Sequence, residues 1–212
     1  MIEIDLVITK DTATPALRSL RAGLEPENLM PIFGRSVANA VRANFDELEA
    51  SRPNKLGGQR THYYSGARSA TRYVVEGDTA IVGIAQVGMR LRYYGGTVEA
   101  GKNVSSFTGQ PTKYLTIPAT AESYGHRAAD FPDMVVLWGH AGPYALARQE
   151  QGSVATVGSK GPQTKQTEIL FWLKASVDIE GDRTMLPSDD AIREAVTGDF
   201  NSYVRNLWRY GT

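Results

Sequence analysis

The sequence predicts an α+β fold: a single domain with a mainly antiparallel β-sheet, packed by N-terminal and C-terminal helices. Two observations predict it. Segments of helical periodicity lie near both ends of the chain, and the region between them holds several short β-branched runs separated by Gly, Pro and Asp. We see no internal repeat and no convincing linker in the 212 residues, so we expect one domain over 1–212, with inserted loops near 98–112 and 151–166.

Three helices are expected from their apolar spacing and their ends. Thr14-Pro15 opens a short helix that runs through Ala22 and stops at Gly23. Ser188 is the expected N-cap of the last helix. The stripe of the long helix after Pro26 is Phe33, Val37, Ala40, Val41, Phe45 and Leu48. That of the last helix is Ile192, Ala195, Val196, Phe200, Tyr203, Val204 and Leu207.

A β-hairpin is expected where two β-branched runs flank Gly77-Asp78, which is typical of a tight turn. The run over 168–177 is the strongest in the chain and is expected to be a central strand. Other expected strands cover 2–8, 113–117 before Pro118, 134–138 and 144–149, and short helices are expected near 65–71 and 86–94.

The composition limits the classes of function. Lys plus Arg and Asp plus Glu are both 23, so the formal charge is zero and supplies no overall attraction to DNA or an anionic membrane. The absence of cysteine excludes disulfides, thiolate nucleophiles and Cys-ligated metals. No segment approaches the about 20 apolar residues that span a bilayer, and the N-terminus does not resemble a signal peptide. We therefore expect a soluble, cytoplasmic protein.

No motif predicts catalysis. The three histidines, His62, His126 and His140, lack the spacing of a metal site, and the glycines form no phosphate-binding loop. We therefore expect no catalytic, cofactor-binding or metal-ligating residues and no cofactor. Catalytic groups can also converge from distant segments, and in that case Glu99, Glu122 and His126 are the first candidates.

Basic and aromatic residues alternate in two segments, 59–64 and 90–94. Aromatic rings beside cations can stack on nucleic-acid bases. Tyr and Arg are also enriched in protein–protein interfaces. The zero net charge favours the interface reading, so a nucleic-acid partner is not expected.

An ordered set of short motifs runs from about His62 to about Tyr203. The most specific stretch joins an Arg-x-Arg-Tyr-x-Gly-Gly-Thr segment to a Lys-Tyr-Leu-Thr-Ile-Pro-Ala segment. The motifs are His62–Gly66, Glu76-Gly77-Asp78, Gly88–Thr97, Lys113–Ala119, Tyr124-Gly125 with Arg127, Phe171–Leu173 and Leu186-Pro187. Together they resemble the virion-morphogenesis (tail-completion) proteins of Mu-like tailed bacteriophages and prophages.

The resemblance implies a structural role in virion morphogenesis, in tail completion or head–tail joining, and no enzymatic activity. It implies partners among tail-tube, terminator and connector proteins, a possible homo-oligomeric ring, no membrane partner, and a place in the bacterial cytoplasm during assembly and in the virion afterwards. The chain departs from the family at residues 98–111, which replace a short basic connection common in the family. Lys102 lies in this segment, so the resemblance does not assign it an aligned role. The candidate interface residues are Arg90, Arg92, Tyr93, Tyr94, Lys102, Lys113 and Tyr114.

A second hypothesis belongs to another class. The Arg/Tyr clusters or the scattered histidines could instead serve a nucleic-acid-associated or hydrolytic phage protein. Salt-dependent DNA binding would distinguish that protein from a purely structural one.

Overall fold

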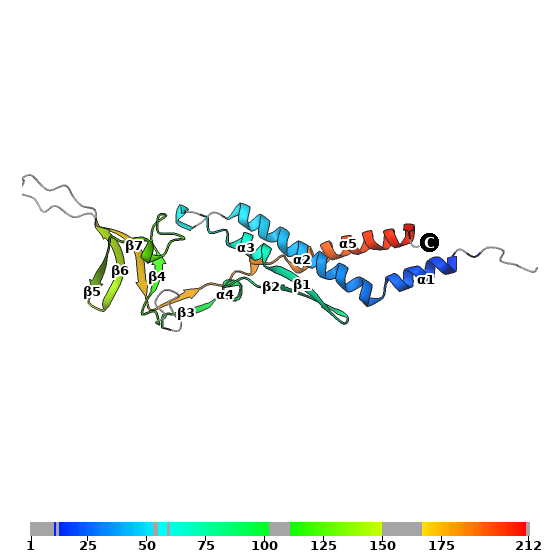
Figure 1. The fold of residues 1–212 in the computed structure, drawn as a ribbon, viewed down its shortest axis with the longest axis horizontal. Coiled ribbons are helices and arrows are strands. Elements are labelled where there is room, and N and C mark those ends of the chain that lie inside the picture. The colour runs from blue at the N-terminus through cyan, green and yellow to red at the C-terminus, as the bar shows by residue number, and fades with distance from the viewer. Residues whose placement is uncertain are drawn as a thin grey trace, which may run out of the picture. The chain divides into compact units, whose positions relative to one another are not determined.

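The computed structural model describes residues 11, 13–52, 55–58, 60–101, 111–149 and 167–210. These residues form five α-helices and eight strands, and every strand pairing is antiparallel (Figure 1). The predicted α+β class is therefore confirmed. The expected strand over 2–8 and the loop over 151–166 lie outside the described residues, as does most of the loop near 98–112.

The chain divides into two compact units. Unit 1 comprises Met1–Leu48, Tyr64–Met89 and Arg183–Thr212, and unit 2 comprises Glu49–Tyr63 and Arg90–Asp182. The chain enters unit 2 twice, so neither unit is a simple half of the sequence. The single domain expected over residues 1–212 stays a prediction.

Helices form most of unit 1. They are α1 (Ala13–Gly23), α2 (Pro26–Ser51), α3 (Tyr63–Ser69) and α5 (Asp189–Tyr210), with the short η3 (Arg183–Met185) before α5. Val41, Phe45 and Leu48 of the predicted α2 stripe are buried, because their spacing places them on one face. The ring of Phe45 stacks 6.3 Å from that of Tyr64, and burying such a side chain contributes about 1.5–3 kcal/mol.

Capping residues mark the starts of α1 and α5. Asp11 accepts hydrogen bonds from the backbone N–H groups of Ala13 and Thr14, at 3.1 and 3.0 Å, before α1. A hydrogen bond with the Thr14 side chain, followed by the backbone bonds, holds the pKa of Asp11 below its ordinary value. The predicted N-cap of α5 is confirmed, since Ser188 Oγ accepts a 3.2 Å hydrogen bond from Ala191 N–H.

The predicted hairpin is confirmed as β1 (Thr71–Glu76) and β2 (Thr79–Ile84), a two-stranded sheet. It packs on α2 at Gly34, where a Cβ atom would lie 2.6 Å from the Tyr73 ring. A glycine inside a helix is normally unfavourable, and here close packing requires it. The short helix expected near 86–94 is α4 (Met89–Tyr94), which starts later because Gly88 has a φ of +78°.

Unit 2 contains two sheets. In one, β3 (Gly96–Glu99) pairs with β8 (Ser176–Ile179). The other has the order β4-β7-β6-β5. Its strands are β4 (Leu115–Pro118), β5 (Met134–Gly139), β6 (Gly142–Gln149) and β7 (Thr167–Lys174). Two more short helices are η1 (Lys55–Gly57) and η2 (Ala128–Asp130).

The single strand expected over 168–177 is partly wrong. Its first part, β7, does lie in the interior of the four-stranded sheet. The chain then breaks at Ala175, and β8 pairs with β3 in the other sheet. Because both parts are β-branched and apolar, the sequence carries no sign of the change of partner.

Candidate assembly surfaces

Helix α4 carries four of the seven candidate interface residues. Arg90, Arg92 and Tyr94 are exposed and Tyr93 is half-buried. The rings of Tyr93 and Tyr94 meet edge to face with centroids 4.9 Å apart, and Tyr94 remains 62% exposed. The helix therefore presents a basic and aromatic surface.

The two basic–aromatic segments of the sequence meet at this helix. The guanidinium carbon of Arg92 lies 3.9 Å from the centre of the Tyr63 ring, which belongs to the first segment. This is cation–π geometry, which orients the guanidinium over the ring. The stack was not predicted, because it joins residues far apart in the sequence.

Close backbone packing fixes the end of α4. A Cβ atom on Gly181 would lie 2.6 Å from the carbonyl carbon of Tyr94, and one on Gly95 would lie 2.7 Å from the nitrogen of Gly181. Asp182 N–H donates a 2.8 Å hydrogen bond to the Arg92 carbonyl oxygen, and the Asp182 carboxylate pairs with Arg52. The positive φ of Gly95, +76°, adds a second reason for glycine there.

Tyr114 belongs to a second surface, at the end of the β5–β6 hairpin. Its hydroxyl lies 3.7 Å from the position of a Cβ on Gly142, and a Cβ on Gly139 would lie 3.4 Å from the Tyr144 ring. Tyr144 in turn lies 6.5 Å from Trp172, centroid to centroid. We call Tyr114, Tyr144 and Trp172 the aromatic cluster.

The rings of this cluster remain open to solvent. Tyr144 is 43% and Trp172 40% exposed, although both lie beside the buried Ala145. Trp138, next to Gly139 in β5, is 71% exposed. Adjacent residues of a strand point to opposite faces, so Trp138 extends the exposed apolar area around the edge of the hairpin. We call Trp138, Tyr144 and the turn between them the hairpin tip.

Trp138, Tyr144 and Trp172 were not predicted as interface residues. One signal was available: the chain has only three tryptophans, and two of them, Trp138 and Trp172, fall in expected strands. Of the remaining predicted residues, Lys113 is exposed just before Tyr114, and Lys102 lies outside the described residues.

An ion pair holds the loop after β4 against β6. Arg148 donates hydrogen bonds of 2.7 and 3.1 Å to the two carboxylate oxygens of Glu122, and its guanidinium lies 5.7 Å from the Phe131 ring. Hydrogen bonding to Arg148 lowers the pKa of Glu122 and that to Glu122 raises the pKa of Arg148. Phe131 also packs on the buried Phe171.

The first candidates for catalysis are only partly brought together. His126 Nδ1 lies 3.8 Å from a carboxylate oxygen of Asp130. Glu99 ends β3, in the other sheet of unit 2. A general acid needs a pKa raised toward neutrality, whereas the pKa of Glu122 is lowered. The two hydrogen bonds between Arg148 and Glu122 have the geometry of a structural ion pair.

The other histidines lie apart. His62 Nδ1 lies 3.0 Å from Glu49 Oε1, and His140 lies in the turn between β5 and β6. Within the described ranges, no group of three or more His, Asp and Glu side chains is placed to hold a metal ion. None of the described helices combines the length and apolar character needed to cross a bilayer.

Comparison of the chain with protein-family models, curated proteins and solved structures gives no match.

Proposed function

We propose that this chain is a structural protein of a tailed bacteriophage or prophage. It acts in virion morphogenesis, in tail completion or head–tail joining, through non-covalent assembly. Two lines support the proposal: the motifs between His62 and Tyr203 that resemble the tail-completion family, and the exposed aromatic residues at the hairpin tip. The hairpin tip is the observation that carries it.

The hairpin tip has the composition of a binding hot spot. Trp and Tyr dominate the residues whose removal weakens protein–protein binding, because they bury much area at a low cost in side-chain entropy. A tryptophan that is 71% exposed leaves most of its ring in water unless a partner covers it. Within the aromatic cluster, the Tyr144 ring lies near Gly139 and the Tyr114 hydroxyl lies near Gly142.

The partners we propose are tail-tube, terminator and connector proteins, and further copies of this chain. Repeated contacts between unlike surfaces close into rings when the rotation allows it. The hairpin tip and α4 are two different surfaces of unit 2, so each can bind a different neighbour. The protein would assemble in the bacterial cytoplasm and remain in the tail or neck of the virion.

Deleting the gene from an inducible prophage tests the proposal. Electron microscopy of the lysate should show DNA-filled heads beside separate or malformed tails, and a plasmid copy of the gene should restore joined particles. Normal virions from the deletion strain would overturn the proposal.

A second candidate has one observation in its favour. The stack of Arg92 on Tyr63 joins the two basic–aromatic segments into one surface, and such surfaces can bind single-stranded nucleic acid. A nucleic-acid-associated protein should bind DNA at low salt and lose affinity steeply as salt rises. Absence of binding at low salt would remove this candidate.

A further inference from the structure

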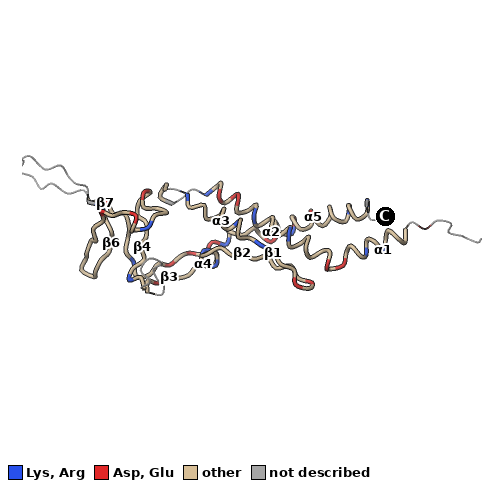
Figure 2. Tube along the Cα trace, in the orientation of Figure 1, with Lys and Arg blue, Asp and Glu red and all other residues tan. Residues whose placement is uncertain are grey.

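The charges of α5 are separated along the helix. All the acidic residues lie in its first half, at Asp189, Asp190, Glu194 and Asp199, together with one base, Arg193, and its other basic residues, Arg205 and Arg209, lie in the second half (Figure 2). The helix dipole favours acids in the first turn and bases in the last. Glu194 and Arg205 lie further inside, where the dipole effect has faded, so the dipole does not explain them.

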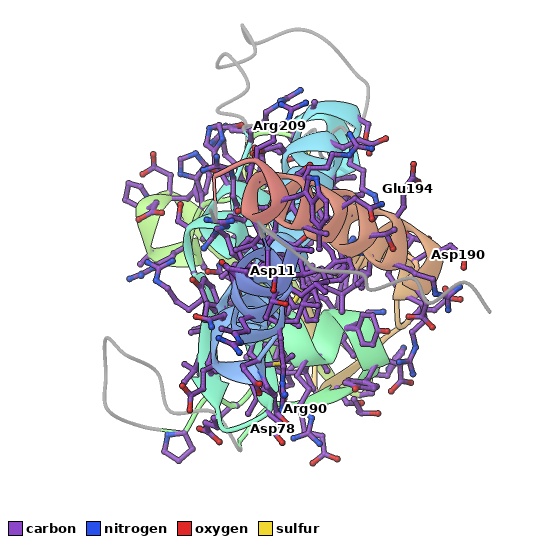
Figure 3. The ribbon with its side chains drawn as sticks, turned by 90° about the vertical axis from the view of Figure 1, so that its right-hand side faces the viewer. Asp11, Asp78, Arg90, Asp190, Glu194 and Arg209 are labelled. Carbon is purple, nitrogen blue, oxygen red and sulfur yellow. The ribbon has the colours of Figure 1, made fainter. Side chains whose placement is uncertain are left out.

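Two of the acids and the two later bases share one face of the helix. Residues three or four positions apart lie above one another on a helix. In the set named next, each residue is three or four positions from the one before it. The set, which we call the α5 stripe, is Asp190, Glu194, Gly198, Asn201, Arg205 and Arg209. All six residues are exposed, and the labelled side chains of Asp190, Glu194 and Arg209 project outward from the helix (Figure 3).

The opposite face of α5 is already occupied within unit 1. Phe200 packs 6.0 Å from Phe33, and the Tyr203 hydroxyl donates a 3.0 Å hydrogen bond to the Gly23 carbonyl oxygen. Leu207 packs so closely on Gly23 that there is no room for a side chain at that position. The α5 stripe therefore faces away from the core.

The charges of the α5 stripe are complementary to those of an antiparallel copy of the same stripe. Its centre lies midway between Gly198 and Asn201. Glu194 is as many residues before that centre as Arg205 is after it, and Asp190 and Arg209 are likewise equally distant. An antiparallel copy of the stripe would therefore place each acid opposite a base.

We propose that the α5 stripe pairs antiparallel with the α5 stripe of a second copy of this chain. Glu194 then lies opposite Arg205 of the second copy, and Asp190 lies opposite Arg209. Twofold symmetry repeats both pairs. This contact is isologous and closes at two copies, unlike the contacts that build a ring.

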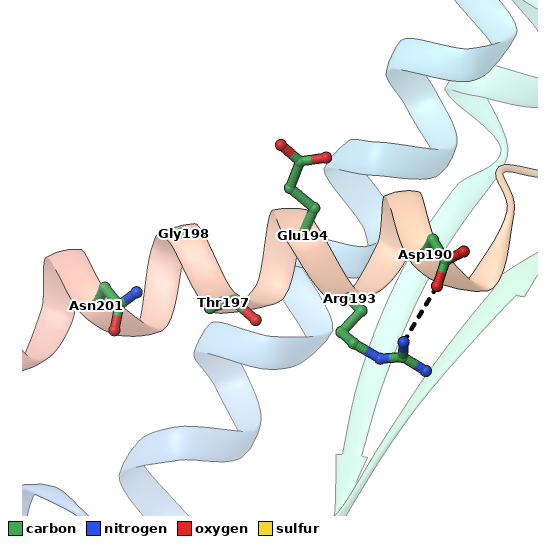
Figure 4. Close-up of a pocket in the computed structure, with 6 residues that line it drawn as sticks. All are labelled: Asp190, Arg193, Glu194, Thr197, Gly198 and Asn201. Atoms are coloured by element: carbon green, nitrogen blue, oxygen red, sulfur yellow. Dashed lines mark hydrogen bonds and ion pairs between the residues drawn. The ribbon is translucent and has the colours of Figure 1, made fainter.

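The middle of the stripe leaves room for a second helix. A shallow hollow runs along α5 from Asp190 to Asn201, over the first half of the stripe as far as its centre (Figure 4). A Cβ atom on Gly198 would meet nothing within 4 Å, so packing within the chain gives no reason for glycine in this exposed turn. Asp190 accepts a 3.1 Å hydrogen bond from Arg193 through one carboxylate oxygen, and this pair is largely exposed. The other carboxylate oxygen of Asp190 remains for Arg209 of the second copy.

A second copy fits the stripe better than an anionic polymer does. The two acids and two bases of the stripe sum to zero, and a phosphate backbone lying along it would meet Asp190 and Glu194. Trp208, 63% exposed one residue before Arg209, adds apolar area at the end of the contact. The inference does not depend on a role in the virion.

Sedimentation velocity of the purified full-length chain tests the pairing. The wild type should show a monomer–dimer equilibrium that weakens at high salt. Glu194→Arg and Arg205→Glu should each weaken the dimer by about tenfold or more, because each converts two attractive pairs into two repulsive ones. An equimolar mixture of the two variants should form dimers again, since every pair in the mixed dimer joins opposite charges.

Glu47→Arg makes the same charge change at an exposed position of α2 and should leave the dimer unchanged. Circular dichroism verifies that all the variants stay folded. A wild type that remains monomeric at every concentration would overturn the pairing, as would variants that dimerise like the wild type or a mixture that does not recover. Salt-sensitive binding of DNA by a chain that stays monomeric would also overturn it. These results leave the prophage deletion experiment unaffected, so failure of one proposal can be told from failure of the other.

Discussion

The guanidinium carbon of Arg92 lies over the ring of Tyr63, 3.9 Å from its centre. The same residue accepts a hydrogen bond at its carbonyl oxygen from Asp182 N–H. Arg92 therefore links helix α4 to two other segments of unit 2, one through its side chain and one through its backbone.

We expect the Arg92–Tyr63 stack to contribute a coupling energy of about 0.5–1 kcal/mol, as for a cation over an exposed ring. A double-mutant cycle with Arg92→Ala and Tyr63→Ala, followed by urea unfolding, measures it directly. Arg90→Ala, on the same helix, is the matched control. Additive effects of the two substitutions would show that the stack contributes nothing.

Replacing Gly181 by Ala should destabilise the protein by about 1–3 kcal/mol, because the new methyl group would overlap the Tyr94 backbone. Gly198→Ala makes the same chemical change where nothing is within 4 Å and should stabilise the helix by about 0.5–1 kcal/mol. Urea unfolding of both variants at low protein concentration compares them. Equal effects of the two changes would contradict the close packing of Tyr94 on Gly181.

The buried hydroxyls of Ser36 and Thr71 should respond differently to removal. Ser36 Oγ has no hydrogen-bond partner among the described residues, so Ser36→Ala should be neutral or slightly stabilising. Thr71 Oγ1 donates a 2.9 Å hydrogen bond to the Ala67 carbonyl oxygen, so Thr71→Val should cost about 1 kcal/mol. Thermal unfolding of each variant measures the difference, and a larger loss for Ser36→Ala would refute the assignment.

The Glu122–Arg148 pair should make stability depend on pH in the acid range. The folded-state pKa of Glu122 is lowered, first by its hydrogen bond to Arg148, so the pair stabilises the fold above the ordinary carboxyl pKa. That contribution is lost as pH falls through the lowered pKa. Glu122→Gln should therefore melt below the wild type at pH 7, and the difference should shrink on acidification.

Glu25→Gln removes an exposed carboxylate elsewhere in the chain, and it serves as the control. A melting difference between Glu122→Gln and the wild type that stays constant from neutral to acid pH would contradict the ion pair.

The elements that could be predicted from the sequence have strong local signals. The apolar faces of α2 and α5 follow from helical spacing, and Gly77-Asp78 marks the hairpin turn. Strand β3 was missed because it has only four residues and begins with Gly96. The switch of sheets at Ala175 was missed because pairing partners leave no mark on a single strand.

The candidate surfaces were predicted only in part. Helix α4 and Tyr114 came from the family resemblance, whereas the aromatic cluster draws its rings from β6, β7 and the segment before β4. Non-local pairing places these rings together, so no window of the sequence contains them. The charge symmetry of α5 is present in the sequence, but its meaning depends on knowing which face of the helix is exposed.

The most direct test of the account is complementation of the prophage deletion with the variant Trp138→Ala/Tyr144→Ala. Both residues are exposed at the hairpin tip, so circular dichroism should show a folded protein. The control, Leu17→Ala/Val74→Ala, removes equally exposed apolar side chains outside the tip. We predict that the control restores joined particles and that the tip variant leaves heads and tails separate or malformed. Normal virions with the folded tip variant would contradict the claim that this surface carries the assembly function.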